Sequence, residues 1–230
     1  MPLLKKNRRT RKRKRMIGGK HAVPTFHVLI ISVGRPTLKE MIDSLRHELK
    51  EGDALTIVFD GKSAKKNSTY SDEWTANMKC AIHVKEQIPG LKHWGHPTIN
   101  KYIHTLQPET TFLMHADDDD TYTKGSFDIL RTKCTDPNIL YFTKMNYTSY
   151  PMIIPSLGTT MLIRNNVGKP NGIIPFKEAG KVAFGTGRTS DYEYYRDLQA
   201  KVKSVVFLDD ITYTVGKYTG NVKDGDINIK

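Results

Sequence analysis

Four consecutive aspartates, Asp117 to Asp120, follow a short apolar segment at residues 111–114. Neighbouring carboxylates repel one another, so a folded protein keeps four together only where a cation, hydrogen-bond donors or open water offsets their charge. At the end of a buried strand, the simplest such partner is a hard divalent cation held by carboxylate oxygens, often together with substrate phosphates. An acidic loop exposed to water is the alternative, and the aspartates alone leave both interpretations open.

Apolar segments of strand length alternate with amphipathic segments in the first half of the chain. Residues 26–33 form a nearly continuous apolar run, which is typical of a strand buried on both faces of a parallel sheet. Further strands are predicted at residues 54–59, 81–84 and 111–114, with helices after the first, third and fourth strands. This order predicts an α/β fold, a single Rossmann-like domain with a mostly parallel central sheet and right-handed crossovers.

The second half of the chain is less regular, because glycine- and proline-rich loops interrupt it. Short strands are expected at residues 139–142, 159–163 and 205–208. Two helices are predicted to begin with a capping box, in which a serine or threonine stands three positions before a glutamate. These pairs are Thr37 with Glu40 and Ser190 with Glu193.

The N-terminal segment, residues 1–22, is strongly basic. Nine lysines and arginines with no acid among them occupy residues 5–15, and subtracting them from the net charge of +12 leaves about +3 for the rest of the chain. High charge and little apolar content predict a disordered arm. Binding to nucleic acid, nuclear import and attachment to anionic lipid all suit such an arm.

The sequence contains no apolar stretch of the length that a membrane span needs, and its basic start lacks the apolar stretch of a secretory signal. Cys80 and Cys134 stand alone without metal-ligand spacing, which fits a reducing compartment. We therefore expect a cytoplasmic protein without a transmembrane segment. The basic arm makes the nucleus the alternative location.

Three polar motifs follow predicted strands. Gly34-Arg35 follows the first strand, Asp60-Gly61 the second, and the four aspartates the strand at residues 111–114. Because the carboxyl ends of parallel strands meet at one edge of a sheet, where ligands bind, we expect these motifs to lie close together. Their coincidence favours the metal interpretation of the aspartates over the acidic loop.

In their order and spacing these motifs resemble those of glycosyltransferases with the GT-A fold, particularly the large family 2-like group. The matching residues are Ser32-Val33-Gly34-Arg35-Pro36, Asp60-Gly61, Asp118-Asp119-Asp120 before Thr121-Tyr122, and Ser190-Asp191-Tyr192, where the family usually carries Glu-Asp. The resemblance covers about residues 26 to 200. It implies a glycosyltransferase domain at residues 23–230, with a nucleotide-binding half at about 23–135 and an acceptor half at about 136–230.

The resemblance implies a metal-dependent enzyme that moves a single sugar from a nucleotide-diphosphate sugar, with UDP-sugars favoured, to a hydroxyl acceptor with inversion. The cofactor would be Mn²⁺ or Mg²⁺, which neutralises the charge that develops on the departing diphosphate. Asp118 would contact the ribose or assist the metal, and Asp120 would bind the metal directly. Because the aspartates are consecutive, Asp117 and Asp119 form the alternative pair.

The resemblance also implies further site residues. Asp60 would accept a hydrogen bond from the nucleotide base, and Arg35 suits the diphosphate because a guanidinium matches phosphate oxygens. Ser32 and Asn100 complete the implied donor-binding residues. Asp191 is the candidate general base that deprotonates the acceptor. An acid in the first turn of a helix also stabilises the helix dipole without any catalytic role, and this alternative stays open.

The acceptor implied by these features is a saccharide or a modified nucleic-acid base, and in the second case the basic arm would bind the DNA. Two other function classes remain. A nucleotidyltransferase usually has a glycine-rich phosphate loop with a following lysine, whereas Gly34-Arg35-Pro36 offers one glycine. An inactive module that binds nucleic acid through its arm would lack any metal-dependent hydrolysis of nucleotide sugars.

Overall fold

The first half of the chain builds the parallel part of the sheet. The computed structural model of the protein describes residues 23–216. Strands β1 (Phe26–Ser32), β2 (Ala54–Asp60), β3 (Ala81–Gln87) and β4 (Phe112–Asp117) pair in parallel in the order β3-β2-β1-β4. The helical segments between them are α1 (Leu38–Leu45), α2 (Ala64–Asn67) and α3 (His96–Tyr102), with 3₁₀ turns at Asp72–Trp74, His93–Gly95 and Ile103–Thr105. All four strands predicted for this half are confirmed.

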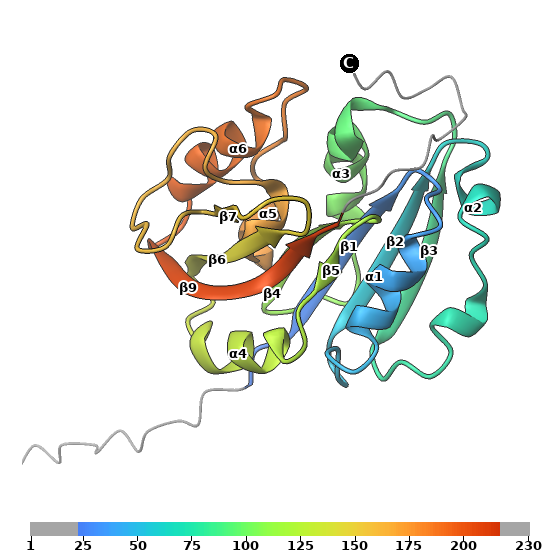
Figure 1. Cartoon of the computed structure of the whole chain (residues 1–230), viewed down its shortest axis with the longest axis horizontal. Coiled ribbons are helices and arrows are strands. Elements are labelled where there is room, and N and C mark those ends of the chain that lie inside the picture. Colours follow the sequence, from blue (N-terminus) through green and yellow to red (C-terminus); the bar gives the residue numbers. More distant parts are fainter. Residues whose placement is uncertain (1–22, 217–230) are drawn as a thin grey trace, which may run out of the picture.

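The second half extends the same sheet with mixed pairing (Figure 1). Strand β8 (Gly172–Pro175) runs antiparallel to β4, and β6 (Ile139–Tyr147) runs antiparallel to β8 and parallel to β9 (Ser204–Val215). The remaining elements are β5 (Thr121–Tyr122), β7 (Ile153–Ile154), α4 (Ser126–Lys133), α5 (Phe176–Ala179), α6 (Ser190–Gln199) and a 3₁₀ turn at Lys169–Asn171. The predicted α/β domain with a mostly parallel central sheet is confirmed, and the sheet is curled.

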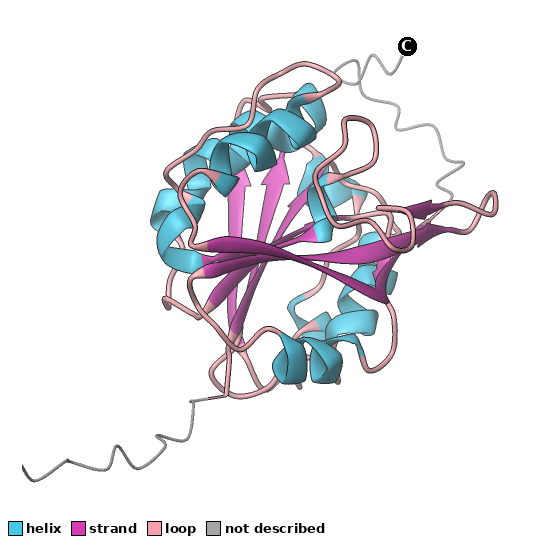
Figure 2. Cartoon of the chain, turned by 90° about the vertical axis from the view of Figure 1, so that its left-hand side faces the viewer, coloured by secondary structure: helices cyan, strands magenta, loops and turns pink. Residues whose placement is uncertain are grey.

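Strand β1 lies inside the sheet, between β2 and β4, and is buried along its whole length. Val28 and Ile30 pack in one apolar cluster with α1 and α4, whereas Leu29 and Ile31 pack in another with α3 and α6. Because neighbouring side chains of a strand point to opposite faces, a continuous apolar run covers both faces of the sheet. Figure 2 shows helices on both sides of the sheet. This packing fixes the edge at which β1, β2 and β4 end.

One strand predicted for the second half is wrong. Residues 159–163 lie in a loop, where Met161 is 65% and Ile163 is 47% exposed. Strand propensity expresses how well a side chain fits a pleated and half-buried surface, so apolar residues without a paired strand do not suffice. The antiparallel neighbours of β6 are β7 and β8 instead.

Neither predicted capping box forms. Thr37 precedes α1, but its side chain makes no capping hydrogen bond. At α6 the cap position belongs to Thr189, whose Oγ1 donates to Glu193 at 2.7 Å, and Ser190 Oγ donates to the carbonyl of Gly187 at 2.6 Å. Both helices nevertheless form near their predicted starts, because their apolar stripes pack on the sheet.

The basic arm at residues 1–22 lies outside the described residues, so its disorder and its partners stay predictions. The domain boundaries and the division of the domain into two halves also stay predictions. Between residues 23 and 216, no helix combines the length and the apolar character that crossing a membrane requires.

Buried histidines make the fold sensitive to acid. Burial lowers the pKa of His27 on β1 from 6.5 to about 4, and burial lowers the pKa of His115 on β4 to about 3. As the pH falls below about 6.5, the unfolded chain takes up protons that the folded protein excludes. Each histidine therefore removes about 1.4 kcal/mol of stability per pH unit until its folded pKa is reached.

We predict that His27→Gln makes the loss of stability with falling pH shallower. Glutamine retains a donor for Thr56 Oγ1, which lies 2.8 Å from His27 Nε2, but it does not titrate. Urea unfolding between pH 6.5 and 4.5 measures both slopes. The variant should lose about 1.4 kcal/mol less per pH unit than the native protein, because every other titrating group is the same in both. Identical slopes would show that His27 takes up a proton equally well in the folded and unfolded protein, which would contradict a lowered pKa.

Candidate active site

The four aspartates at the end of β4 divide into two pairs that face different surroundings. Asp118 and Asp119 both pair with Arg35, whose Nη1 lies 2.8 Å from Asp118 and 2.9 Å from Asp119. Asp117 and Asp120 instead line a cavity. The chain therefore offsets part of the clustered charge with an internal cation and directs the other two carboxylates to a space that a ligand can enter.

Asp118 joins the ends of β1 and β4. It is 1% exposed, and it accepts hydrogen bonds from Ser32 Oγ at 2.7 Å and from the main-chain nitrogen of Val33 at 3.0 Å. Burial by itself lowers the pKa of Arg35, but the charges of Asp118 and Asp119 outweigh that effect and raise it. The structure thus brings Ser32, Arg35 and Asp118 together, and their polar groups bind one another. Their roles in binding a donor, and the role of Asp118 in binding a metal, stay predictions.

Asp60 and Asn100 lie on the same edge of the sheet and hold loops there. Asp60 accepts hydrogen bonds from the main-chain nitrogen of Leu91 and from Thr98 Oγ1, each at 2.8 Å. The side-chain amide of Asn100 donates to the carbonyl of Phe184 and accepts from its main-chain nitrogen, each at 2.8 Å. Neither residue lines the cavity, so their predicted contacts with a donor stay predictions.

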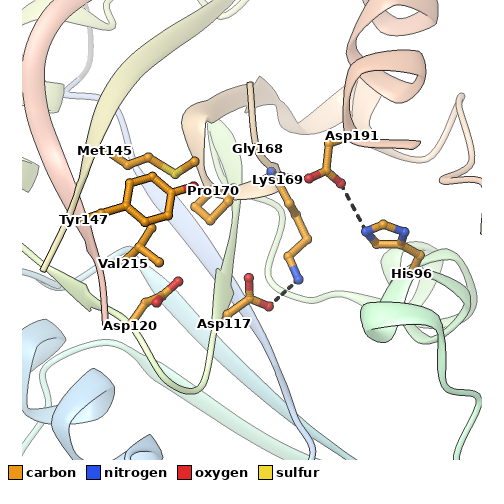
Figure 3. Close-up of a pocket in the computed structure, with 10 residues that line it drawn as sticks. All are labelled: His96, Asp117, Asp120, Met145, Tyr147, Gly168, Lys169, Pro170, Asp191 and Val215. Carbon is orange, nitrogen blue, oxygen red and sulfur yellow. Dashed lines mark hydrogen bonds and ion pairs between the residues drawn. The ribbon is translucent and has the colours of Figure 1, made fainter. Parts of the chain in front are cut away.

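The cavity has a volume of about 190 Å³, and residues from positions 96–120 and from positions 145–215 line it (Figure 3). Asp117 and Asp120 approach it from the end of β4, and Asp191 approaches it from the first turn of α6. The other lining residues are His96, Met145, Tyr147, Gly168, Lys169, Pro170 and Val215. Three carboxylates therefore line one small cavity.

The electrostatics of the aspartates reflect this crowding. Burial raises the pKa of Asp120 to about 8, and the charges of Asp117 and Asp119 add to that rise. Burial also raises the pKa of Asp119 to about 6, although Arg35 acts in the opposite direction. A cation placed among these oxygens would stabilise their ionised forms, because an opposite charge favours the charged state.

Asp191, the candidate base, is held from two sides. Its Oδ1 lies 3.1 Å from His96 Nε2, and its Oδ2 accepts a hydrogen bond from the main-chain nitrogen of Lys169 at 3.0 Å. The other ring nitrogen of His96 lies 3.0 Å from Ser190 Oγ and 3.1 Å from the carbonyl of Gly185. The contacts of Nδ1 fix the ring of His96, and the hydrogen bond from Lys169 holds the carboxylate of Asp191.

Lys169 and His96 are partners of the acidic residues that the sequence alone does not reveal. Lys169 forms an ion pair with Asp117, which precedes it by 52 positions. A single lysine in a glycine- and proline-rich loop has no local signal that distinguishes it from a surface lysine. His96 is distant in the sequence from Ser190 and Asp191. Predicting their contact would have required knowing that α3 and α6 pack together.

The cavity fits a hard divalent cation in part. Asp117 and Asp120 provide carboxylate oxygens, which Mg²⁺ and Mn²⁺ prefer as ligands. Within residues 23–216, no three histidine, cysteine, aspartate or glutamate side chains converge on a common metal position. The remaining ligands of a cation would therefore come from water or from a substrate.

This fold is that of GT-A-type glycosyltransferases, as comparison with solved structures shows. S. aureus TarS 1–349 superposes with a TM-score of 0.65 at 15% identity over 84% of this chain. Its complex with UDP-GlcNAc gives 0.66 at 13% identity over 86%. The mannosyltransferase PcManGT from Pyrobaculum calidifontis, in complex with GDP-Man and Mn²⁺, gives 0.57 at 9% identity over 89%.

The similarity at these identities concerns the fold. The matched region spans 60% of the TarS 1–349 chain and 59% of the PcManGT chain. No protein-family model matches the sequence, and no curated protein matches it.

We predict that Asp118→Asn destabilises the protein by about 3 kcal/mol, because it removes one partner of a buried ion pair. The substitution also relieves repulsion among the aspartates, so we expect the loss of stability to lie at the lower end of the range of about 3 to 5 kcal/mol for breaking a buried ion pair. The matched control is Asp43→Asn, since Asp43 likewise forms ion pairs, with Lys39 and Arg46, but is 41% exposed. Its loss should stay below about 1 kcal/mol. Chemical denaturation measures both, and equal losses would contradict a structural role for Asp118.

Proposed function

We propose that this protein is a glycosyltransferase that moves a single sugar from a nucleotide-diphosphate sugar to a hydroxyl acceptor. The observation that carries the proposal is the cavity itself. Two carboxylates that a metal could use, Asp117 and Asp120, line it together with Asp191, the proposed base. The cavity lies at the carboxyl end of β4 in a GT-A-type fold, where ligands of α/β sheets bind.

The proposed donor is a UDP-sugar, and the proposed cofactor is Mn²⁺ or Mg²⁺. TarS with UDP-GlcNAc and PcManGT with GDP-Man and Mn²⁺ support a nucleotide sugar and a divalent metal. A bound metal would neutralise the charge that develops on the diphosphate as the sugar leaves. Asp117 and Asp120 are the residues that would hold it, and Asp118 and Arg35 would keep their strand end in place.

The remaining donor contacts follow from the motifs. Asp60 and Asn100 would shape the part of the site that receives the nucleoside, since they anchor the loops around residues 91 and 184. Arg35 is 17% exposed and would lie on the diphosphate side of the aspartates. The cavity, at about 190 Å³, is too small for a whole nucleotide sugar. It would therefore hold the reacting centre only.

Asp191 would deprotonate the acceptor hydroxyl as it attacks the anomeric carbon of the sugar. A base that activates the acceptor for direct displacement gives inversion at that carbon, which is the stereochemical outcome we propose. The main-chain nitrogen of Lys169 orients the carboxylate, whose other oxygen lies 3.1 Å from His96 Nε2, and orientation of a catalytic group contributes to the rate. The acceptor is proposed to be a saccharide or a hydroxylated nucleic-acid base, and the basic arm would contribute only in the second case.

The proposal predicts slow metal-dependent hydrolysis of a nucleotide sugar, with water as the acceptor. UDP-GlcNAc, UDP-glucose and GDP-Man are incubated with the full chain and Mn²⁺, and the released nucleoside diphosphate is measured. We expect release from at least one donor, and we expect chelation of the metal to reduce it at least about 100-fold, because the leaving group loses its counter-charge. The absence of release from a wide panel of nucleotide sugars would contradict the proposal.

Asp191→Asn should retain donor binding and lose turnover. Removal of a general base typically costs about 10² to 10⁴ in rate, while the donor contacts remain. Calorimetry with UDP measures binding, and product release measures turnover. Glu193→Gln is the matched control, since Glu193 lies in the same helical turn and accepts a hydrogen bond from Thr189. Unchanged turnover in Asp191→Asn would exclude this residue as the base.

A further inference from the structure

Lys169 is a buried cation inside the proposed active site. Its side chain is 4% exposed, and its ammonium forms an ion pair with Asp117 and lies 3.4 Å from the carbonyl of Trp94. In Figure 3 the side chain extends from its loop across the cavity to Asp117. Asp117 is one of the two carboxylates that would hold the metal, so the ammonium occupies an oxygen that the metal would use.

The backbone around Lys169 is anchored independently of this ion pair. Tyr195 Oη donates to the carbonyl of Lys169 at 2.5 Å, and the main-chain nitrogen of Lys169 donates to Asp191. Asn171 Nδ2 donates to the carbonyls of Thr143 and Ile154, each at 2.9 Å. A change of the side chain at position 169 therefore leaves the loop attached to β6 and α6.

The ammonium of Lys169 offsets part of the negative charge in the cavity. Asp117, Asp120 and Asp191 line the same small space, and among residues 23–216 Lys169 is the lysine or arginine that lines it with them. Burial by itself lowers the pKa of Lys169, but the charges of Asp117, Asp191 and Asp120 outweigh that effect and raise it. A divalent cation that enters alone must share Asp117 with this ammonium. A divalent cation that enters with a diphosphate brings anionic oxygens to which the ammonium can bind.

We propose that Lys169 is an internal counter-ion that competes with the divalent metal for Asp117 and thereby couples metal binding to binding of the diphosphate. The inference rests on the proposed function. In the free protein Lys169 neutralises Asp117 and keeps the affinity for metal alone low. When metal and diphosphate enter together, the diphosphate replaces Asp117 as the partner of the ammonium. Metal and donor then bind cooperatively, and by linkage each raises the affinity for the other equally.

The test measures Mn²⁺ binding directly, by electron paramagnetic resonance of free Mn²⁺, with and without UDP. For the native protein we expect weak binding of Mn²⁺ alone and at least ten-fold tighter binding with UDP. Lys169→Met should bind Mn²⁺ alone at least ten-fold tighter than the native protein, and UDP should then enhance binding less. Lys169→Arg keeps the charge and should behave like the native protein.

Two controls complete the design. Lys181→Met removes a lysine that pairs with Glu178 at 2.8 Å but is 55% exposed, and it should leave Mn²⁺ binding unchanged. In the double variant Lys169→Met with Asp117→Asn, the increase in affinity for Mn²⁺ should disappear, because the carboxylate for which the ammonium and the metal compete is gone. Circular dichroism and thermal unfolding establish that each variant is folded.

The proposal is overturned if folded Lys169→Met binds Mn²⁺ no more tightly than the native protein, including the case in which neither binds it. It is also overturned if UDP enhances Mn²⁺ binding equally in both. These measurements use no nucleotide sugar and no turnover. Failure of the inference is therefore separate from failure of the proposed glycosyl transfer, which is judged by release of nucleoside diphosphate from a sugar donor.

Discussion

Compensation of the negative charge at the end of β4 organises the candidate site. Arg35 forms ion pairs with two of the four carboxylates, Asp118 and Asp119, and Lys169 forms one with Asp117. Asp120 accepts a hydrogen bond from the main-chain nitrogen of Gly216 at 2.8 Å and keeps a raised pKa. Arg35 binds Asp118 and Asp119 at the end of β1, away from the cavity. Asp117 and Asp120 are therefore the two carboxylates that a ligand in the cavity can reach.

The same contacts connect parts of the chain that are distant in the sequence. The cavity receives Asp117 and Asp120 from the end of β4, Lys169 from the loop before β8 and Asp191 from α6. Lys169 touches both groups, since its ammonium pairs with Asp117 and its main-chain nitrogen binds Asp191. In the proposed reaction the donor diphosphate would lie on one side and the acceptor hydroxyl on the other. One short loop would therefore respond to both substrates.

Sequence analysis identified the parallel strands and the edge of the sheet that carries the motifs, because buried strands leave continuous apolar runs and ligand-binding loops follow them. It assigned Asp118 with Asp120, or Asp117 with Asp119, to the metal, whereas Asp117 and Asp120 line the cavity, since four identical residues conceal the register that the turn after β4 imposes. It also predicted a strand at residues 159–163, where apolar residues lack a paired strand. The contacts of Lys169 and His96 with the acidic residues and α6 follow only from the folded structure, because their partners are distant in the sequence.

The central claim is that Asp117 and Asp120 hold a divalent cation that contacts a nucleoside diphosphate. A crystal grown with Mn²⁺ and UDP, with diffraction data collected at the manganese absorption edge, tests it most directly. The account predicts one anomalous peak at Mn–O distance from both carboxylates, with the diphosphate of UDP on the same ion. A nucleotide bound elsewhere, or manganese bound away from this pair, would contradict the account.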